Sequence, residues 1–430
     1  MVQRVIAALA GLLMAGCLID PDHSLLEDGG PVADRAALEA APDRGVDLPD
    51  PGDGPADGPA TDQATPDQAT PDQGPAPDQA PDQGPPPPAQ LLAVRSGGGT
   101  IADLASSATL SLSPAVADVG KTLLVFQATS SDANPTSANV RCRLSSASQI
   151  ACDRVGTAGA VNVQWYVAEF KSGVTVQHLQ PSCDVSGTTT VSIAAVDPKK
   201  TFLLYSGRRA GSIQGEDDME TVELVDATTV EIRKASAACD SDARSLQVVE
   251  LDGASVTRGV TGAMSGTNLD VTGLAAADTT RTFLLYSYRG TLNGATMCDR
   301  MVRGTVLSST SLSFNRGDGA SGCAAAPVDA IAWERVELPA GMSVQQLKAS
   351  VSAGSGAASL SITQVDTGRT LALAGGQWTA GQGIGEGSLS TDDILGAMVG
   401  RLELKSSTTL GVTRDHTGGK ASWSAFVIEF

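Results

Sequence analysis

The hexapeptide TFLLYS occurs at residues 201–206 and again at residues 282–287, which is 282 − 201 = 81 positions later. Looser copies begin at Thr122 (TLLVFQ) and Thr370 (TLALAG). An apolar segment that returns at intervals of roughly 80 residues is typical of tandem structural repeats. We therefore predict four repeats, each with one core strand of this kind.

The segments downstream of each copy repeat as well. Two short apolar segments follow, and then a closing segment that ends in AEF, VEL, VEL or IEF. Because the last of these endings is also the end of the chain, the segment after each earlier ending should open the next repeat. The predicted repeats are 91–170, 171–251, 252–338 and 339–430.

The alternation within each repeat predicts β-strands. Segments such as TLSLS (Thr109–Ser113) and TVSIAAV (Thr190–Val196) alternate apolar and polar residues, which is the pattern of half-buried strands. The continuous apolar run of TFLLYS favours an inner strand. Six or seven strands in about 80 residues, without an amphipathic helix, predict an antiparallel β-sandwich. The predicted fold class is all-β, with four tandem antiparallel β-sandwich modules.

The N-terminus carries an export signal. Residues 1–17 read MVQRVIAALAGLLMAGC, with a positive charge at Arg4 and an apolar run, Val5–Ala15, that is too short to span a bilayer. This segment resembles a bacterial lipoprotein signal. The resemblance implies that 1–16 is a signal peptide and that diacylglycerol is attached to Cys17, which would anchor the protein in the cell envelope, at the outer membrane or the cell surface. The alternative is an ordinary secretory signal with an incidental cysteine; both export the protein.

The next segment, 17–90, is predicted to be a disordered spacer. Residues 18–90 contain no aromatic residue and hold 16 Asp and Glu against Arg35 and Arg44, a net charge of 2 − 16 = −14. Chains rich in Pro, Asp and Gln without large apolar residues do not bury enough surface to fold, and they stay extended. A calcium-binding or partner-binding tract is the alternative, but single carboxylates five residues apart are poor chelators.

The acidic balance of the chain belongs to this spacer. The net charge of the whole chain is −19, so with Arg4 counted the repeats carry only −19 − 1 + 14 = −6. Nucleic-acid binding requires clustered Lys and Arg with stacking aromatics, and neither is evident. We expect no nucleic-acid partner and no cofactor.

The remaining six cysteines fall two to a repeat in the first three repeats. This partition predicts the disulfides Cys142–Cys152, Cys183–Cys239 and Cys298–Cys323, which an exported protein can keep oxidised. Free buried thiols or a metal site are the alternatives, although no CxxC spacing is present.

One arginine and one glutamate recur in every repeat. They are predicted to form structural ion pairs or backbone anchors at strand ends, with a ligand clamp as the alternative. The residues are Arg154, Glu169, Arg233, Glu250, Arg316, Glu337, Arg414 and Glu429.

The sequence contains no recognisable catalytic constellation. It has three histidines and no GxSxG, HExxH or P-loop pattern, so no catalytic or metal residues are predicted. Acidic loops at Asp217–Asp218, Asp299 and Asp392–Asp393 offer calcium sites as a minor alternative to solvated charge. The glycine-rich segment 375–388 is expected to be a long loop, in which Trp378 is a possible sugar-stacking contact.

The repeats resemble tandem domains of uncharacterised exported proteins from myxobacteria-like bacteria. The closing segment VQWYVAEF (Val163–Phe170) is also loosely similar in pattern to the last strand of H-type lectin domains. Trp165 and Trp333 match the tryptophan of that strand, whereas Leu246 and Ala425 replace it in the other repeats. We expect a lipid-anchored surface protein with a structural, adhesive or ligand-binding role and with glycans or surface proteins as partners. The alternatives are a glycan-binding lectin-like protein and a polysaccharide-acting hydrolase or accessory module.

Overall fold

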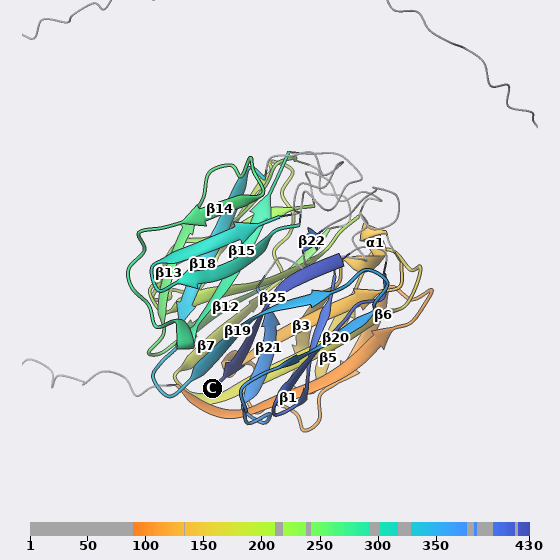
Figure 1. The fold of residues 1–430 in the computed structure, drawn as a ribbon, viewed down its shortest axis with the longest axis horizontal. Coiled ribbons are helices and arrows are strands. Elements are labelled where there is room, and N and C mark those ends of the chain that lie inside the picture. Colours follow the sequence, from red (N-terminus) through yellow and green to blue (C-terminus); the bar gives the residue numbers. More distant parts are fainter. Residues whose placement is uncertain are drawn as a thin grey trace, which may run out of the picture. The chain divides into compact units, whose positions relative to one another are not determined.

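The computed structural model describes residues 89–132, 134–210, 218–237, 242–291, 301–316, 328–375, 382–384, 399–417 and 420–430. Residues 79–430 belong to one compact unit. Apart from two 3-10 turns and the four-residue helix α1 (Pro135–Ala138), the regular elements of the described residues are β-strands, which confirms the all-β fold class (Figure 1). None of the helices in the described residues is long and apolar enough to cross a membrane. The predicted signal peptide, Cys17 and nearly all of the spacer lie outside the described residues.

The first repeat contains two small antiparallel sheets. Their strand orders are β1-β6-β3 and β2-β5-β4. The strands are β1 (Gln90–Ile101), β2 (Ser107–Ser111), β3 (Thr122–Ser130), β4 (Arg141–Ser146), β5 (Gln149–Asp153) and β6 (Val161–Ser172).

The same pair of sheets returns in each of the next three stretches of chain. The second repeat has β7 (Val174–Leu179), β8 (Thr188–Ser192), β9 (Thr201–Arg208), β10 (Glu220–Asp226), β11 (Thr229–Lys234) and β12 (Ala243–Leu251). The third has β13 (Ser255–Val260), β14 (Asn268–Val271), β15 (Thr282–Arg289), β16 (Arg303–Ser308), β17 (Ser311–Asn315) and β18 (Ala330–Glu337). The fourth has β19 (Ser343–Val351), β20 (Ala357–Ser361), β21 (Thr370–Ala374), β22 (Gln382–Ile384), β23 (Arg401–Ser406), β24 (Thr409–Thr413) and β25 (Lys420–Glu429).

The TFLLYS strands are not the inner strands of their sheets. The central strand is the closing one, β6, β12, β18 or β25, and the TFLLYS-type strands β3, β9, β15 and β21 lie at the edge. They are nevertheless buried, because other repeats cover them. Their apolar character therefore comes from packing between repeats, which a pattern within one repeat does not reveal.

Each closing strand packs on both faces. In β6, Val163, Trp165 and Val167 belong to the core between the two sheets of repeat 1. The alternate residues Tyr166 and Ala168 belong to a larger core that the repeats share. Since side chains alternate along a strand, one strand serves both cores.

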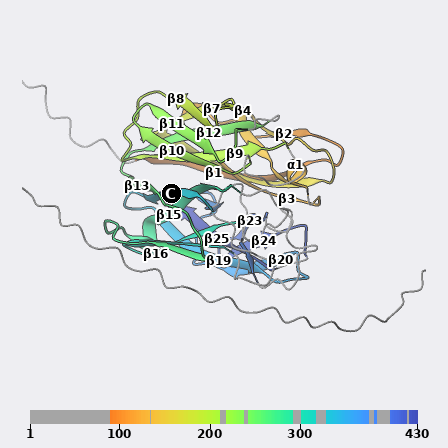
Figure 2. The same cartoon turned by 90° about the horizontal axis from the view of Figure 1, so that it is seen from above.

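The four repeats contact one another in a closed order. In Figure 2 the strands of repeats 1 and 2 form one half of the unit, and those of repeats 3 and 4 form the other. Equivalent backbone bonds join the opening strand of a repeat to its neighbour: the Val256 amide donates to the Lys199 carbonyl, and the Val94 amide donates to the Gly368 carbonyl, so repeat 1 also meets repeat 4. Aromatic pairs at Phe202–Phe283 and Phe170–Phe430, with centroids 5.7 and 5.3 Å apart, fill the same two junctions.

The closing-strand tryptophans are core residues that pack on glycine. Trp165 lies opposite Gly97 on β1, and Trp333 lies opposite Gly259 on β13. A Cβ added at Gly97 would come within 2.5 Å of the Trp165 ring, so only glycine leaves room for the indole. Repeat 2 has two leucines at the same paired positions, Leu179 and Leu246. The same space between the two strands is thus filled by one large and one very small residue in repeats 1 and 3, and by two residues of intermediate size in repeat 2.

Candidate functional site

The recurrent arginines are backbone anchors. Arg154 is fully buried and its guanidinium donates to five carbonyl oxygens, those of residues 102, 105, 157, 158 and 159, at 2.6–3.1 Å. Arg414 donates to the Ser352 and Ser355 carbonyls, and Arg316 donates to the Gly266 carbonyl at 2.7 Å. Each side chain thus holds the loop between the first and second strands of its repeat, and Arg154 also holds the loop that leads into the closing strand.

The recurrent arginines lie before the start of the closing strand, and the recurrent glutamates lie near its end. The expected Arg–Glu ion pairs therefore do not form. Glu169 pairs with Arg95 at 2.7 Å, and Glu337 pairs with Arg281 at 2.8 Å. Glu250 and Glu429 accept the amides of Asp197 and Asp366. At about 3.3 Å per residue, the closing strand separates the two groups by more than 20 Å.

The prediction of Arg233 as the recurrent arginine of repeat 2 is wrong by one residue. The amides of Arg154 and Arg414 bond the carbonyl that precedes the second strand of their repeats, and in repeat 2 Lys234 makes this bond, to Gly187. Arg233 instead pairs with the neighbouring Glu231 and is partly exposed.

The disulfide Cys142–Cys152 is present, with an S–S distance of 2.04 Å, and it joins β4 to β5 as predicted. Cys183 is also disulfide-bonded. Its predicted partner Cys239, the pair Cys298 and Cys323, and Trp378 lie outside the described residues, as do Asp217, Asp299 and Asp392–Asp393.

One position of the closing strand supplies a polar link to a neighbouring repeat in three of the four repeats. It lies three residues before the recurrent glutamate and is occupied by Tyr166, Gln247, Glu334 and Phe426 in the four repeats. The Gln247 amide accepts from the Leu124 N–H at 2.8 Å and donates to the Leu124 carbonyl at 2.7 Å. A glutamine side chain thus hydrogen-bonds the edge of β3 that has no strand partner in its own sheet.

The equivalent residues of repeats 3 and 1 make corresponding bonds. The Glu334 carboxylate accepts the N–H of Leu203, which is the residue of β9 that matches Leu124, at 2.7 Å. The Tyr166 hydroxyl accepts from the Leu404 N–H at 2.9 Å and contacts the Leu402 carbonyl at 3.3 Å. Each of these polar side chains hydrogen-bonds the backbone of another repeat.

A second position pins the opening strands in the same way. His178 Nε2 lies 3.1 Å from the carbonyls of Val119 and Thr122 in repeat 1. The matching Arg258 donates to the Pro198 and Thr201 carbonyls of repeat 2. Burial lowers the pKa of His178. We therefore assign it the role of a neutral side chain that hydrogen-bonds the backbone of repeat 1.

A cavity of about 90 Å³ lies where the TFLLYS-type strands of the four repeats meet. Its wall includes the equivalent aromatic residues Phe126, Tyr205 and Tyr286, together with Gln247 and Glu334. This space is large enough for several water molecules or for a group of a few heavy atoms.

Glu334 is the titratable carboxylate of this wall. Burial raises its pKa to about 6, against the opposing effects of Arg258 and the Leu203 amide. The folded state therefore binds the proton more tightly than the unfolded state, and Glu334 lowers stability as the pH rises from about 4.5 through 6. A shift of this size corresponds to about 2 kcal/mol at neutral pH.

We expect Glu334→Gln to be more stable than the wild type at pH 7.5, by about 1–2 kcal/mol, and similar to it at pH 4.5. Glutamine repeats the arrangement seen at Gln247, and the charge that burial penalises is gone. Urea unfolding at a series of pH values measures the difference. The reciprocal Gln247→Glu should gain the pH dependence that Glu334→Gln loses; parallel pH profiles for wild type and Glu334→Gln would contradict the assignment.

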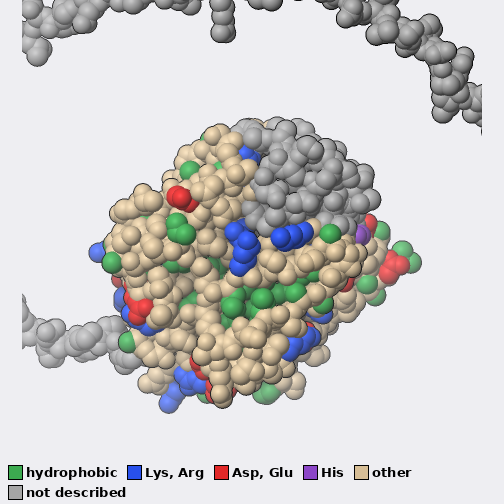
Figure 3. All heavy atoms as spheres, viewed as in Figure 1, with side chains coloured by type: hydrophobic (Ala, Val, Ile, Leu, Met, Phe, Trp, Pro, Cys, Tyr) green, Lys and Arg blue, Asp and Glu red, His purple; other side chains and the backbone are tan. Residues whose placement is uncertain are grey.

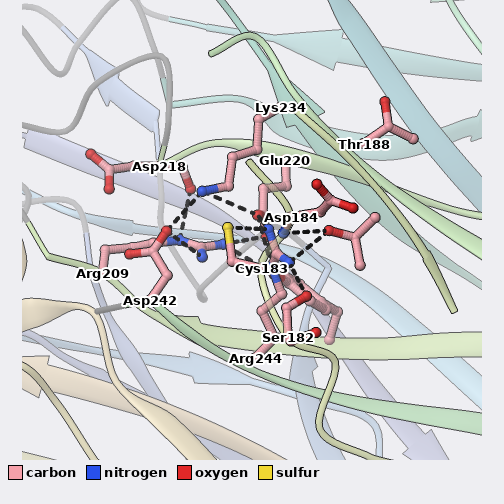
Figure 4. Close-up of polar contacts among 12 residues, drawn as sticks. Ser182, Cys183, Asp184, Thr188, Arg209, Asp218, Glu220, Lys234, Asp242 and Arg244 are labelled. Atoms are coloured by element: carbon pink, nitrogen blue, oxygen red, sulfur yellow. Dashed lines mark hydrogen bonds and ion pairs between the residues drawn. The ribbon is translucent and has the colours of Figure 1, made fainter. Parts of the chain in front are cut away.

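Repeat 2 holds a buried network of charged side chains, shown in Figure 4. Glu220 lies at its centre, fully buried, and bonds Arg209, Arg244 and the Tyr205 hydroxyl. A second carboxylate, Asp242, pairs with Lys234 at 2.8 Å and with Arg209 at 3.4 Å. The remaining donors of Arg244 reach the Ser182 carbonyl, Thr189 Oγ1 and Cys183 Sγ.

The network breaks the symmetry of the repeats. The residues that match Glu220 in repeats 1 and 3 are Val140 and Val302, both buried in apolar cores. Burial would raise the pKa of Glu220, but Arg209 and Arg244 outweigh it and hold the pKa below its ordinary value. A carboxylate held ionised between two guanidinium groups is a poor proton acceptor. We therefore assign the network a role in stability.

Most of the surface drawn in Figure 3 is neutral, with few charged side chains. Among the described residues, no group of three or more His, Cys, Asp or Glu side chains is placed to hold a metal ion. No protein-family model matches the chain, and no curated protein matches it.

A motif that our sequence prediction did not include recurs at the start of all four TFLLYS-type strands. In DVGKT, DPKKT, DTTRT and DTGRT the threonine hydroxyl donates to the carbonyl of the aspartate at 2.6–2.7 Å. The spacing D-x-x-[KR]-T was visible in the sequence and predicts the turn that holds these strands in place.

Proposed function

We propose that this protein is an exported, lipid-anchored binding protein of the cell envelope, in which the four repeats form one head on an acidic stalk. The observation that carries the proposal is the set of equivalent side chains, Tyr166, Gln247 and Glu334, that bind the backbone of a neighbouring repeat. Repeats joined in this way present a common surface and do not act as separable modules.

Two further observations support export and anchoring. In the N-terminal segment the apolar run Val5–Ala15 is followed closely by Cys17, as in lipoprotein signals. The buried disulfide Cys142–Cys152 suits an oxidising compartment. The acidic spacer would hold the head away from the membrane, and the ligand would be a glycan or a surface protein.

Anchoring is tested by labelling with radioactive palmitate in a bacterial host. We expect the wild type to take up label and to fractionate with membranes, and Cys17→Ala to remain unlabelled and to appear in the soluble fraction. Labelled Cys17→Ala, or an unlabelled wild type, would contradict the anchor.

Binding is tested on the full chain with a panel of polysaccharides, with product release monitored in the same wells. Saturable binding without products supports a binding head. Release of shortened products would replace this proposal with a polysaccharide hydrolase.

A further inference from the structure

A cluster of three arginines lies at the junction of repeats 1 and 2. Arg141 and Arg143 come from β4, and Arg208 ends β9, which contacts β4 (Figure 2). All three reach Asp153 at the end of β5. The shortest distances are 2.7 Å from Arg141 Nη2, 2.7 Å from Arg208 Nη1 and 3.4 Å from Arg143 Nη1.

The cluster carries more positive charge than Asp153 can balance. Three guanidinium groups against one carboxylate leave a net charge of 3 − 1 = +2. Burial, Arg141 and Arg208 lower the pKa of Arg143, and among the described residues Asp153 is the carboxylate that opposes them. The electrostatic potential at the open side of the cluster therefore favours an anion.

The arginines also have spare hydrogen-bond donors. A guanidinium has five N–H groups in a planar fork that matches an oxyanion. The buried Nε of Arg208 has no acceptor among the described residues. The side chain of Arg141 is 9% exposed, whereas those of Arg143 and Arg208 are 28% and 31% exposed. Arg141 is fixed against Asp153, and the other two face solvent.

The contact between repeats 1 and 2 does not require all three arginines of the cluster. Arg208 alone joins repeat 2 to Asp153 of repeat 1, and Arg141 completes a bidentate pair with the same carboxylate. Arg143 adds only a long contact and a like charge beside two others. The contact between the repeats therefore leaves the position of Arg143 unexplained.

We propose that Arg143 and Arg208 form an oxyanion-binding site that takes the sulfate, phosphate or carboxylate group of an acidic polysaccharide. The oxyanion site stands on the geometry alone; its polysaccharide ligand rests on the proposed function. A free inorganic anion presents the same chemistry, so the two sources are compared directly.

The test measures binding of the full chain to dextran sulfate and to uncharged dextran, with inorganic sulfate as a competitor. We expect the protein to bind dextran sulfate and not uncharged dextran, and we expect added salt to weaken this binding. Arg143→Gln/Arg208→Gln should lose at least about tenfold in affinity, because both partly exposed guanidinium groups are removed. Arg233→Gln removes one positive charge at a partly exposed position outside the cluster, and should bind like the wild type.

Charge-retaining variants and a stability check keep the result interpretable. Arg143→Lys/Arg208→Lys should bind with intermediate affinity, because the charge remains and the forks are lost. Variants are compared only if their thermal transitions match that of the wild type. Equal affinity of the double glutamine variant and the wild type, for both the polymer and inorganic sulfate, would overturn the site. Binding of inorganic sulfate that depends on Arg143 and Arg208, without binding of the polymer, would keep the oxyanion site and reject the polysaccharide ligand. Failure of Cys17 labelling would reject the anchor without touching this site.

Discussion

Glu220→Ala is expected to destabilise the protein by about 3–5 kcal/mol, one of the two largest effects of a single substitution that we predict. Glu220 is fully buried and bonds two arginines and a tyrosine. Its removal leaves Arg209 and Arg244 without their central partner in a site sealed from water. Urea unfolding followed by circular dichroism measures the loss.

The control for Glu220→Ala is Glu231→Ala on the next strand, β11. Glu231 also pairs with an arginine, Arg233, but that guanidinium is 41% exposed. Exposed pairs contribute at most about 1 kcal/mol, so the control should stay close to the wild type. Equal losses in the two variants would show that burial of the network does not matter and would reject its structural role.

Arg154→Met should cost a similar amount, about 3–5 kcal/mol, through a different mechanism. Methionine keeps the apolar volume but removes the donors for five loop carbonyls. The carbonyls then lose their partners where Arg154 had excluded water, and the loop between β5 and β6 loses its anchor. The loss should appear as a lower urea midpoint and as faster proteolysis within 154–160.

Arg233→Met separates anchoring from the mere presence of an arginine. The sequence pattern gives Arg233 the same role as Arg154, whereas the structure gives that place to Lys234. We expect Arg233→Met to change stability by less than about 0.5–1 kcal/mol. A large loss in Arg233→Met with none in Arg154→Met would reverse the assignment.

The fold class was predictable because it depends on local patterns. Period-two alternation identifies strands such as Thr109–Ser113, and the recurrence of TFLLYS reveals the repeats before any contact is known. The disulfide Cys142–Cys152 was predictable because both cysteines flank one tight hairpin. These features need only residues that are close in sequence.

The candidate site was mostly not predictable, because it depends on contacts between distant strands. Nothing in the sequence around Glu334 and Leu203, which are 131 positions apart, shows that they bond across two repeats. A useful signal existed in the alignment of the repeats: Glu220 falls where Val140 and Val302 stand, and a charge at an apolar position marks a special environment. The register error at Arg233 arose because an arginine also occurs one residue before the anchoring position.

The predicted pairing of the recurrent arginines with the recurrent glutamates is wrong. Both residues recur in every repeat, and recurrence alone suggested that they act together. In fact each meets a different part of the backbone or a different ion-pair partner, since they occupy opposite ends of the closing strand. Repetition therefore identified structural residues without identifying their partners.

The central claim is that the four repeats form one cooperative head, and differential scanning calorimetry of the full chain tests it most directly. We expect one transition in which the calorimetric and van't Hoff enthalpies agree, because equivalent side chains join each repeat to its neighbour. Several transitions, or a calorimetric enthalpy about four times the van't Hoff value, would show that the repeats unfold independently and would contradict the account.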